Sequence, residues 1–326
     1  MKKDSILVTG GAGFIGSNLV RSLNQRGSNN IIVADDLTNG RKALNLSDLS
    51  IQDYISYKDL IPLLNEGKIE NISCIFHQGA CTDTTEWDGN YMMKTNYEYS
   101  KSLLNWSLSN KVDFIYASSA SVYGTGTKFV EDRKYENPIN VYAYSKFLFD
   151  EYVRSKINLH RDSNIIGLRY FNVYGFGESH KEHMTSPMHH FYKQLLESET
   201  IKLFKGSGGY NDGEQERDYI YIDDVVKINL WFYDNFNEKN NLSGIYNTGT
   251  GKAETFNIIA KTIIEYFGRG KIQYIDFPKK LLGSYQSYTQ ADISALKNAG
   301  YNDHFTELKD GISLYLGKLE DQINKK

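Results

Sequence analysis

Residues 6–23 read ILVTGGAGFIGSNLVRSL, and this stretch decides the fold. The apolar residues 6–8 are typical of a short buried strand, and an amphipathic run follows the glycines. Between them, Gly10, Gly13 and Gly16 allow a tight turn and the close approach of a pyrophosphate, whose charge would meet exposed N–H groups at the start of the helix. The order strand, glycine turn, helix therefore predicts a dinucleotide site rather than a purely structural turn.

The next expected strand, residues 31–34, ends in two acidic residues that bear on the choice of dinucleotide. Asp35 and Asp36 lie about twenty residues beyond the glycines, where a carboxylate holds ribose hydroxyls and favours NAD. Arg41 and Lys42 follow, and these cations would neutralise the 2′-phosphate of NADP. The residues leave NAD and NADP open, and a solvated charged loop is the plain alternative.

A third strand is expected at residues 74–76, and His77 at its end is interpreted as a packed residue rather than a catalyst. Small residues after it would let a cofactor lie against the backbone at the carboxyl edge of the sheet. A helical run from about 95 to 109 begins near Asn96, a candidate polar contact on the cofactor side. The candidate cofactor loop consists of Gln78, Gly79, Ala80 and Cys81.

Proton-transfer groups are expected after a fourth strand, residues 114–117. Ser119 follows this strand and can donate to a substrate oxygen. Tyr142 and Lys146 are four residues apart in a helix-like run, so both lie on one face, and the ammonium would favour the phenolate form of the tyrosine. The chain holds 25 Tyr, so this pair gains its weight from the cofactor motifs upstream.

Composition indicates an ordinary globular protein of 326 residues, with 40% hydrophobic and 24% charged residues. A net charge of −3 gives no reason to expect nucleic acid or an acidic membrane as a partner. Cys74 and Cys81 form no metal or disulfide framework, so no metal site is predicted and a reduced cytoplasm is the simplest location. No targeting or membrane-spanning segment is expected.

The predicted fold class is α/β, a doubly wound parallel (Rossmann) sheet with a smaller α/β substrate-binding domain. The dinucleotide-binding domain is expected at 1–172 and the substrate domain mainly at 173–326, with segments near 220–250 returning to the Rossmann domain. Asp223 and Asp224 are interpreted as the N-cap of a helix rather than as metal ligands. Further elements are expected as a helix at 186–196 and strands at 201–204, 219–222 and 245–247.

The motifs T-G-G-x-G-F-I-G, S-S and Y-x-x-x-K, in this order, resemble the extended short-chain dehydrogenase/reductase family over nearly the whole chain. Longer strings, EWDG at 86–89, YMM at 91–93, KFLFDEY at 146–152 and RYFNVYG at 169–175, resemble the ADP-L-glycero-D-manno-heptose 6-epimerases within it. The resemblance implies an enzyme that transfers a hydride from the substrate to NADP. The keto intermediate then turns its opposite face to the cofactor, and the hydride is returned to that face. It also implies an ADP-heptose substrate, a role in heptose supply for lipopolysaccharide core, and a homo-oligomer that is expected to be a pentamer.

The resemblance assigns roles to individual residues. Tyr142 and Lys146 form the catalytic pair, Ser119 is the hydroxyl at the substrate, and Lys181 is a second acid/base, although the residues alone favour a solvated loop lysine there. Arg217 suits a diphosphate because a guanidinium forms paired hydrogen bonds. The implied cofactor contacts are Gly10, Gly13, Phe14, Ile15, Gly16, Asp35, Asp36, Lys42, Gln78, Gly79, Ala80, Cys81, Asn96, Tyr142, Lys146 and Val173. The implied substrate contacts are Ser119, Asn172, His183, His190, Phe204, Lys205, Gly206, Ser207, Arg217 and Tyr285.

The chain departs from the family pattern at several points. His183 stands where serine is more usual, Asp36 replaces an amide, and Tyr57 replaces a lysine near the adenosine phosphate; the last two weaken the case for NADP. The segment 208–216 is longer than expected and is interpreted as a flexible surface loop.

Two alternatives bear on the function. Another nucleotide-sugar 4-epimerase or 4,6-dehydratase is the nearest rival, but a dehydratase would want a carboxylic acid where Ala120 and Ser121 follow the strand-end hydroxyl. A scaffold protein that has lost its chemistry would not need Ser119, Tyr142 and Lys146 together.

Overall fold

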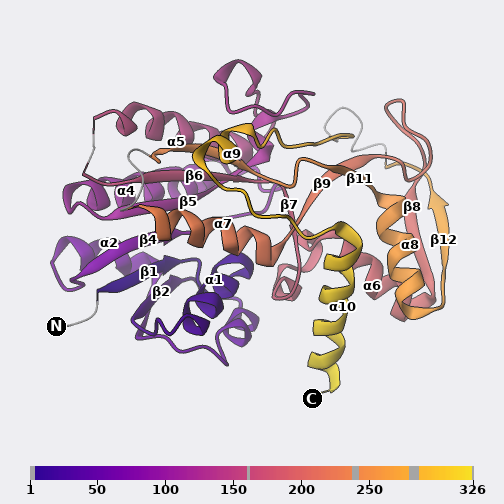
Figure 1. Ribbon diagram of the computed structural model, residues 1–326, viewed down its shortest axis with the longest axis horizontal. Helices are drawn as coiled ribbons and strands as arrows, with labels where there is room; N and C mark the ends of the chain where they lie inside the picture. Colours follow the sequence, from indigo (N-terminus) through magenta and orange to yellow (C-terminus); the bar gives the residue numbers. More distant parts are fainter. Residues whose placement is uncertain (1–3, 160–161, 237–241, 279–285, 325–326) are drawn as a thin grey trace.

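The computed structural model describes residues 4–159, 162–236, 242–278 and 286–324. A seven-stranded sheet forms its larger part, in the order β10-β6-β5-β4-β1-β2-β3 with every neighbouring pair parallel (Figure 1). The predicted doubly wound α/β fold is confirmed. Its strands are β1 (Ser5–Thr9), β2 (Ile31–Asp35), β3 (Asp53–Ser56), β4 (Ile72–His77), β5 (Asp113–Ser119), β6 (Ile165–Tyr170) and β10 (Gly244–Thr248).

Helices cover both faces of this sheet because successive side chains of each strand point to opposite faces. Ile6 and Val8 belong to one core with α1 (Phe14–Gln25) and α7 (Ile222–Asn235). Leu7, between them, belongs to a second core. The helices on that second face are α2 (Tyr57–Asn65), α4 (Tyr99–Ser109) and α5 (Val141–Ile157).

Two small sheets lie beyond the carboxyl edge of the large one. One has the order β11-β9-β7 and the other pairs β12 with β8 in parallel. Figure 1 shows β8 and β12 beside α6 and α8, away from the large sheet. Apart from α7 and β10, the elements that follow β6 are β7 (Asn172–Tyr174), α6 (Pro187–Ser198), β8 (Thr200–Phe204), β9 (Glu216–Tyr221), β11 (Ala253–Thr255), α8 (Phe256–Phe267), β12 (Lys271–Ile275), α9 (Ser294–Ala299) and α10 (Leu308–Asn324).

Two boundary predictions are wrong. The helix expected from about residue 95 begins earlier, at α3 (Gly89–Met92), where the Asp88 side chain accepts a hydrogen bond from the N–H of Tyr91; a π-helical segment, Met93–Glu98, then leads into α4. Asp223 and Asp224 do not cap α7, because β9 runs into the helix through Tyr221, which takes the N-cap position. Both aspartates lie in the first turn, where their charge meets the positive end of the helix.

Helices long and apolar enough to cross a membrane are absent from the part of the chain that the structure describes.

Candidate active site

The glycine turn is built for the close approach of another group. Gly10 has a φ of +68°, and a Cβ there would lie 2.6 Å from the backbone N of Gly79. A Cβ at Gly16 would overlap the carbonyl oxygen of Gly10. Gly13 is the N-cap residue of α1 and brings no side chain, and the first turn of α1 contains no acidic residue. The turn therefore presents the positive end of α1 as the predicted pyrophosphate site requires.

A cavity of about 360 Å³ lies beside this turn, at the carboxyl ends of β1, β2 and β4. Aromatic side chains contribute to its wall through Tyr57, Tyr91 and Tyr99. Predicted cofactor residues that line it are Gly10, Asp35, Asp36, Lys42, Gly79, Ala80 and Cys81. This brings the predicted cofactor residues of three separate segments to one hollow.

The carboxylate of Asp35 already has hydrogen-bond and ion-pair partners within the protein. It accepts hydrogen bonds from the N–H groups of Ala12 (2.7 Å) and Asp36 (2.6 Å) and forms an ion pair with Lys42. Lys42 also donates to the carbonyl oxygen of Asp36 (2.9 Å). Hydrogen bonds from Thr38 hold the pKa of the Asp36 carboxyl below its usual range. At this end of the cavity, Lys42 therefore bridges the carboxylate of Asp35 and the backbone carbonyl of Asp36.

Buried side chains hold the predicted cofactor loop, residues 78–81, in place. His77 is buried between the hydroxyls of Thr9 (2.6 Å) and Ser100 (2.7 Å), and burial lowers the pKa of its imidazole to about 3, so it is a packed neutral residue as expected. Asn96 is also buried; its amide pairs with both the N–H and the carbonyl of Cys81 (2.8 and 2.9 Å). Asn96 thus holds the loop, and its contact with the cofactor stays a prediction.

Two further predicted cofactor residues are also engaged within the protein. Gln78 accepts a hydrogen bond from the hydroxyl of Tyr170 (2.9 Å) and donates to Asn229 (3.2 Å). Val173 pairs with Ile220 between β7 and β9.

The three predicted proton-transfer residues meet at the carboxyl end of β5. Ser119 is the last residue of β5, and Tyr142 lies in the first turn of α5, where Asn140 caps the helix through the N–H of Ala143 (2.7 Å). A hydrogen bond with Ser119 lowers the pKa of Tyr142, but burial has the larger effect and raises it. The phenol is therefore held in its neutral form, and the expected stabilisation of the phenolate by Lys146 is not the dominant effect.

Lys146 is buried one turn along α5 and donates to the carbonyl oxygen of Ala117 (2.8 Å). Burial lowers the pKa of its ammonium to about 8, while the charge of Asp150 acts in the opposite direction. The ammonium of Lys146 can thus lose its proton near neutral pH, whereas the phenol of Tyr142 stays neutral there.

Lys181 is not the solvated loop lysine that its local sequence favours. It lies in the 3-10 segment Ser179–Met184, half-buried, with Nζ 5.4 Å from the ring centroid of Phe14 at the start of α1. Burial lowers the pKa of its ammonium, and the charge of Glu178 opposes this shift. Lys181 therefore lies close to the start of α1, and its role as a second acid/base stays a prediction.

The predicted substrate residues are distributed over several places. Asn172 donates to the carbonyl of Asp218 (3.1 Å), and the buried Arg217 lies over the ring of Phe256 at 5.9 Å. His190 and Phe204 line a cavity of about 370 Å³ between α6 and β8.

Other substrate predictions fall outside that cavity. Lys205 and Gly206 line a separate depression, and Lys205 forms an ion pair with Asp276 (2.8 Å). Ser207 accepts a hydrogen bond from Gln215 (3.4 Å). His183 is exposed, 3.9 Å from the carboxylate of Asp83. Tyr285 lies outside the described residues. The segment 208–216 is tied to α8, since Asn257 donates to the carbonyl of Asp212 (2.8 Å).

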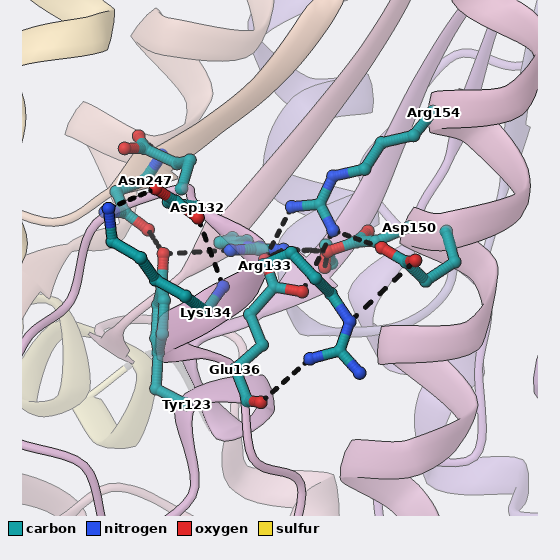
Figure 2. Close-up of polar contacts among 12 residues, drawn as sticks. Tyr123, Asp132, Arg133, Lys134, Glu136, Asp150, Arg154 and Asn247 are labelled. Carbon is teal, nitrogen blue, oxygen red and sulfur yellow. Dashed lines mark hydrogen bonds and ion pairs between the residues drawn. The ribbon is translucent and has the colours of Figure 1, made fainter.

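Sequence reasoning missed a buried group of charges behind the catalytic pair. Figure 2 shows Asp150, Glu136 and Arg154 in a chain of polar contacts. Arg169, fully buried on β6, joins Asp150 (2.8 Å) to Glu136 (2.5 Å). The available signal was Asp150, four residues after Lys146 and so on the same face of the helix, and Arg169, the one charged residue in the run IIGLRY.

Comparisons with known proteins agree with this architecture. A sequence profile of the NAD dependent epimerase/dehydratase family matches residues 6–249. The ADP-L-glycero-D-manno-heptose-6-epimerase of Alkalilimnicola ehrlichii is 51% identical over 318 residues, which cover 97% of this chain and 98% of the relative.

Solved structures show the same likeness over the whole length. The ADP-L-glycero-D-manno-heptose-6-epimerase of Helicobacter pylori has a TM-score of 0.82 and 32% identity, covering 98% of this chain and 97% of its own. The UDP-glucose 4-epimerase of Thermotoga maritima, solved with UDP-glucose, has a TM-score of 0.79 and 28% identity, covering 98% and 99%.

Proposed function

The chain belongs to the NAD dependent epimerase/dehydratase family, and on that premise we propose that it is an ADP-L-glycero-D-manno-heptose 6-epimerase. It inverts C6″ of ADP-D-glycero-D-manno-heptose by transient oxidation and re-reduction. The observation that carries the proposal is the 51% identity with a protein of that name over 97% of the chain. The arrangement of Ser119, Tyr142 and Lys146 with the glycine turn supplies the chemistry that the reaction needs.

The described residues fit a nicotinamide dinucleotide. Gly10 and Gly16 leave room that a Cβ would fill, and the start of α1 offers its positive end to a pyrophosphate. The cavity lined by Asp35 and Lys42 has the place of an adenosine site. When bound, the dinucleotide supplies an acceptor, and then a donor, for the hydride at the carbon that is inverted.

Protons are handled by the side chains. Tyr142 accepts the proton of the C6″ hydroxyl as this carbon is oxidised, and Ser119 donates a hydrogen bond to the same oxygen. Lys146, as an ammonium, stabilises the phenolate form of Tyr142, which takes up this proton and becomes a phenol. After the keto intermediate turns its other face, Lys181 serves as acid/base for the second orientation. The hydride and the proton both return, so the substrate has no net redox change.

We propose NADP rather than NAD as the dinucleotide. The ion pair with Lys42 neutralises Asp35, which would otherwise repel a 2′-phosphate, and Arg41 is an exposed cation on the same loop. A comparison of NADP and NAD affinities by calorimetry tests this. Tighter binding of NADP, together with a larger loss of NADP than of NAD affinity in Lys42→Met, is the expected result; tighter binding of NAD would contradict it.

We also propose that the protein is a homo-oligomer in the cytoplasm, with a pentamer as the expected size. The support is the family resemblance, together with two free cysteines. Light scattering coupled to size-exclusion chromatography measures the oligomer, and a monomer across the concentration range would contradict the proposal.

The function itself is tested by NMR. Purified protein is mixed with ADP-D-glycero-D-manno-heptose without added dinucleotide, and the C6″ configuration is followed. Conversion to the L-glycero epimer is expected. If there is none after addition of NADP or NAD, the heptose assignment fails, and UDP-, GDP- and dTDP-sugars tested in the same assay would show whether the enzyme is a different nucleotide-sugar epimerase.

A further inference from the structure

Asp150 is a fully buried carboxylate on α5, one helical turn after Lys146. It accepts hydrogen bonds from the hydroxyls of Tyr116 (2.8 Å) and Ser118 (2.9 Å), both on β5. It also accepts one from Nε of Arg169 on β6 (2.9 Å). One side chain thus ties the helix that carries the catalytic pair to two adjacent strands.

Two polar contacts between α5 and β5 involve the two residues that directly precede Ser119 in the strand. Lys146 donates to the carbonyl of Ala117, and Ser118, the next residue, donates to Asp150. Ser119 follows as the end of the strand and carries the hydroxyl that bonds to Tyr142. The position of Ser119 relative to Tyr142 is therefore set by two contacts within the two preceding residues.

The charges around Asp150 alternate in sign. Arg169 lies between Asp150 and Glu136, and Glu136 in turn pairs with Arg154 (2.5 Å). Figure 2 shows Tyr123 and Asn247 at the far side of this group; Arg169 donates to the Tyr123 hydroxyl (3.0 Å), which donates to Asn247 (2.6 Å). A buried ion network gives little stability that apolar side chains would not give, but its directional bonds fix orientation.

We propose that Asp150 is a positioning residue of the active site, which holds β5 and Ser119 in place against Tyr142 and Lys146 on α5. The inference rests on the proposed function, since it concerns the residues that carry out that reaction. Its alternative is that Asp150 serves only to stabilise the core.

Asp150 also acts on Lys146 through its charge. Titratable groups that face Lys146 are Asp150 on its own helix, and His77 and Cys81 at and after the end of β4. His77 is neutral, and the charge of Asp150 raises the pKa of Lys146, against the larger effect of burial. Removing this charge lowers that pKa, so Lys146 loses its proton at a lower pH.

The test compares Asp150→Asn with Glu136→Gln in the epimerisation assay, over a range of pH. Both variants remove one carboxylate partner of Arg169, so both are expected to lower the melting temperature. Only Asp150→Asn should lower kcat by about tenfold or more with KM nearly unchanged, and move the alkaline limit of kcat about one pH unit lower. If the two variants lose the same fraction of kcat and have the same alkaline limit, the proposal is overturned in favour of a purely structural role for Asp150.

Two measurements keep the test decisive if Asp150→Asn does not fold. Ser118→Ala removes one contact of Asp150 and keeps its charge, so kcat should fall while the alkaline limit stays in place; an unchanged kcat would overturn the proposal. In the wild type, the Lys146 ammonium can be followed by nitrogen NMR, with Lys146→Arg to identify its signal. Conversion of the substrate by the wild type tests the proposed function separately. If the wild type is active and the Asp150 and Ser118 variants keep its kcat, the positioning role of Asp150 fails while the proposed function stands.

Discussion

The pKa values of Tyr142 and Lys146 are shifted mainly by burial, not by the four-residue spacing of the two side chains. Burial raises the pKa of the phenol and lowers that of the ammonium, since both charged forms lose hydration. Tyr142 can accept a proton from a substrate hydroxyl only as the phenolate, so the ammonium of Lys146, whose pKa is about 8, has to offset part of the cost of that ionisation. The bond from Ser119 partly offsets the cost of ionising Tyr142.

Tyr142→Phe should lower turnover by about two to four orders of magnitude, because it removes the proton acceptor and leaves the ring in place. Dinucleotide affinity, measured by calorimetry, should change little. Tyr144→Phe is the matched control, since Tyr144 lies two residues away on α5 and is 46% exposed. Unchanged turnover in Tyr142→Phe would exclude this residue as the catalytic acid/base.

Lys181→Met should also lower epimerisation by about two orders of magnitude, because the long apolar stem remains and only the second proton-transfer group is lost. The assay is the NMR conversion described above. The exposed Lys193, changed to Met, serves as the control for loss of a lysine charge. Equal rates for the two variants would show that Lys181 has no catalytic role.

At the scale of elements, local patterns predicted the strands β1, β2, β4 and β5, the glycine turn and the position of Asp35, because these depend on side-chain alternation and glycine placement. The start of α7 was not predictable from Asp223, since β9 continues directly into the helix and Tyr221 takes the cap position. The burial of Lys181 against Phe14 depends on packing between distant segments, which a local pattern does not contain.

The glycine turn makes a prediction at the scale of the element. In Gly16→Ala the new Cβ would overlap the carbonyl oxygen of Gly10, so the turn must shift. We expect dinucleotide affinity to fall by about tenfold or more, with a lower melting temperature. Gly89→Ala is the control, since a Cβ there has open space around it. Unaltered affinity in calorimetry would show that the turn does not contact the dinucleotide.

At the scale of the whole molecule, two buried histidines link stability to pH. Burial lowers the pKa of His77 to about 3 and that of His189 to about 4. In the unfolded chain these imidazoles take up protons below about pH 6.5, whereas in the folded protein they stay neutral. The free energy of unfolding therefore falls as the pH decreases from about 6.5 toward the two folded-state pKa values.

His77→Asn should reduce this acid destabilisation. Between about pH 7.5 and 4.5 the wild type should lose roughly 2–3 kcal/mol through His77, and the variant should lack that loss. Urea denaturation at the two pH values measures it, with the exposed His304→Asn as the control. The same pH dependence in the wild type and in His77→Asn would contradict the assignment of a neutral buried His77.

The large sheet is completed by a strand from late in the chain: β10 pairs with β6, and 73 residues lie between Tyr170 and Gly244. At a synthesis rate of about 5–20 residues per second, the edge of β6 that will pair with β10 stays unpaired for roughly 4–15 s. An unpaired strand edge is a template for association with other chains. A nascent chain of this protein is therefore most exposed to aggregation between the emergence of β6 and that of β10, and a ribosome that stalls in this interval would prolong the hazard.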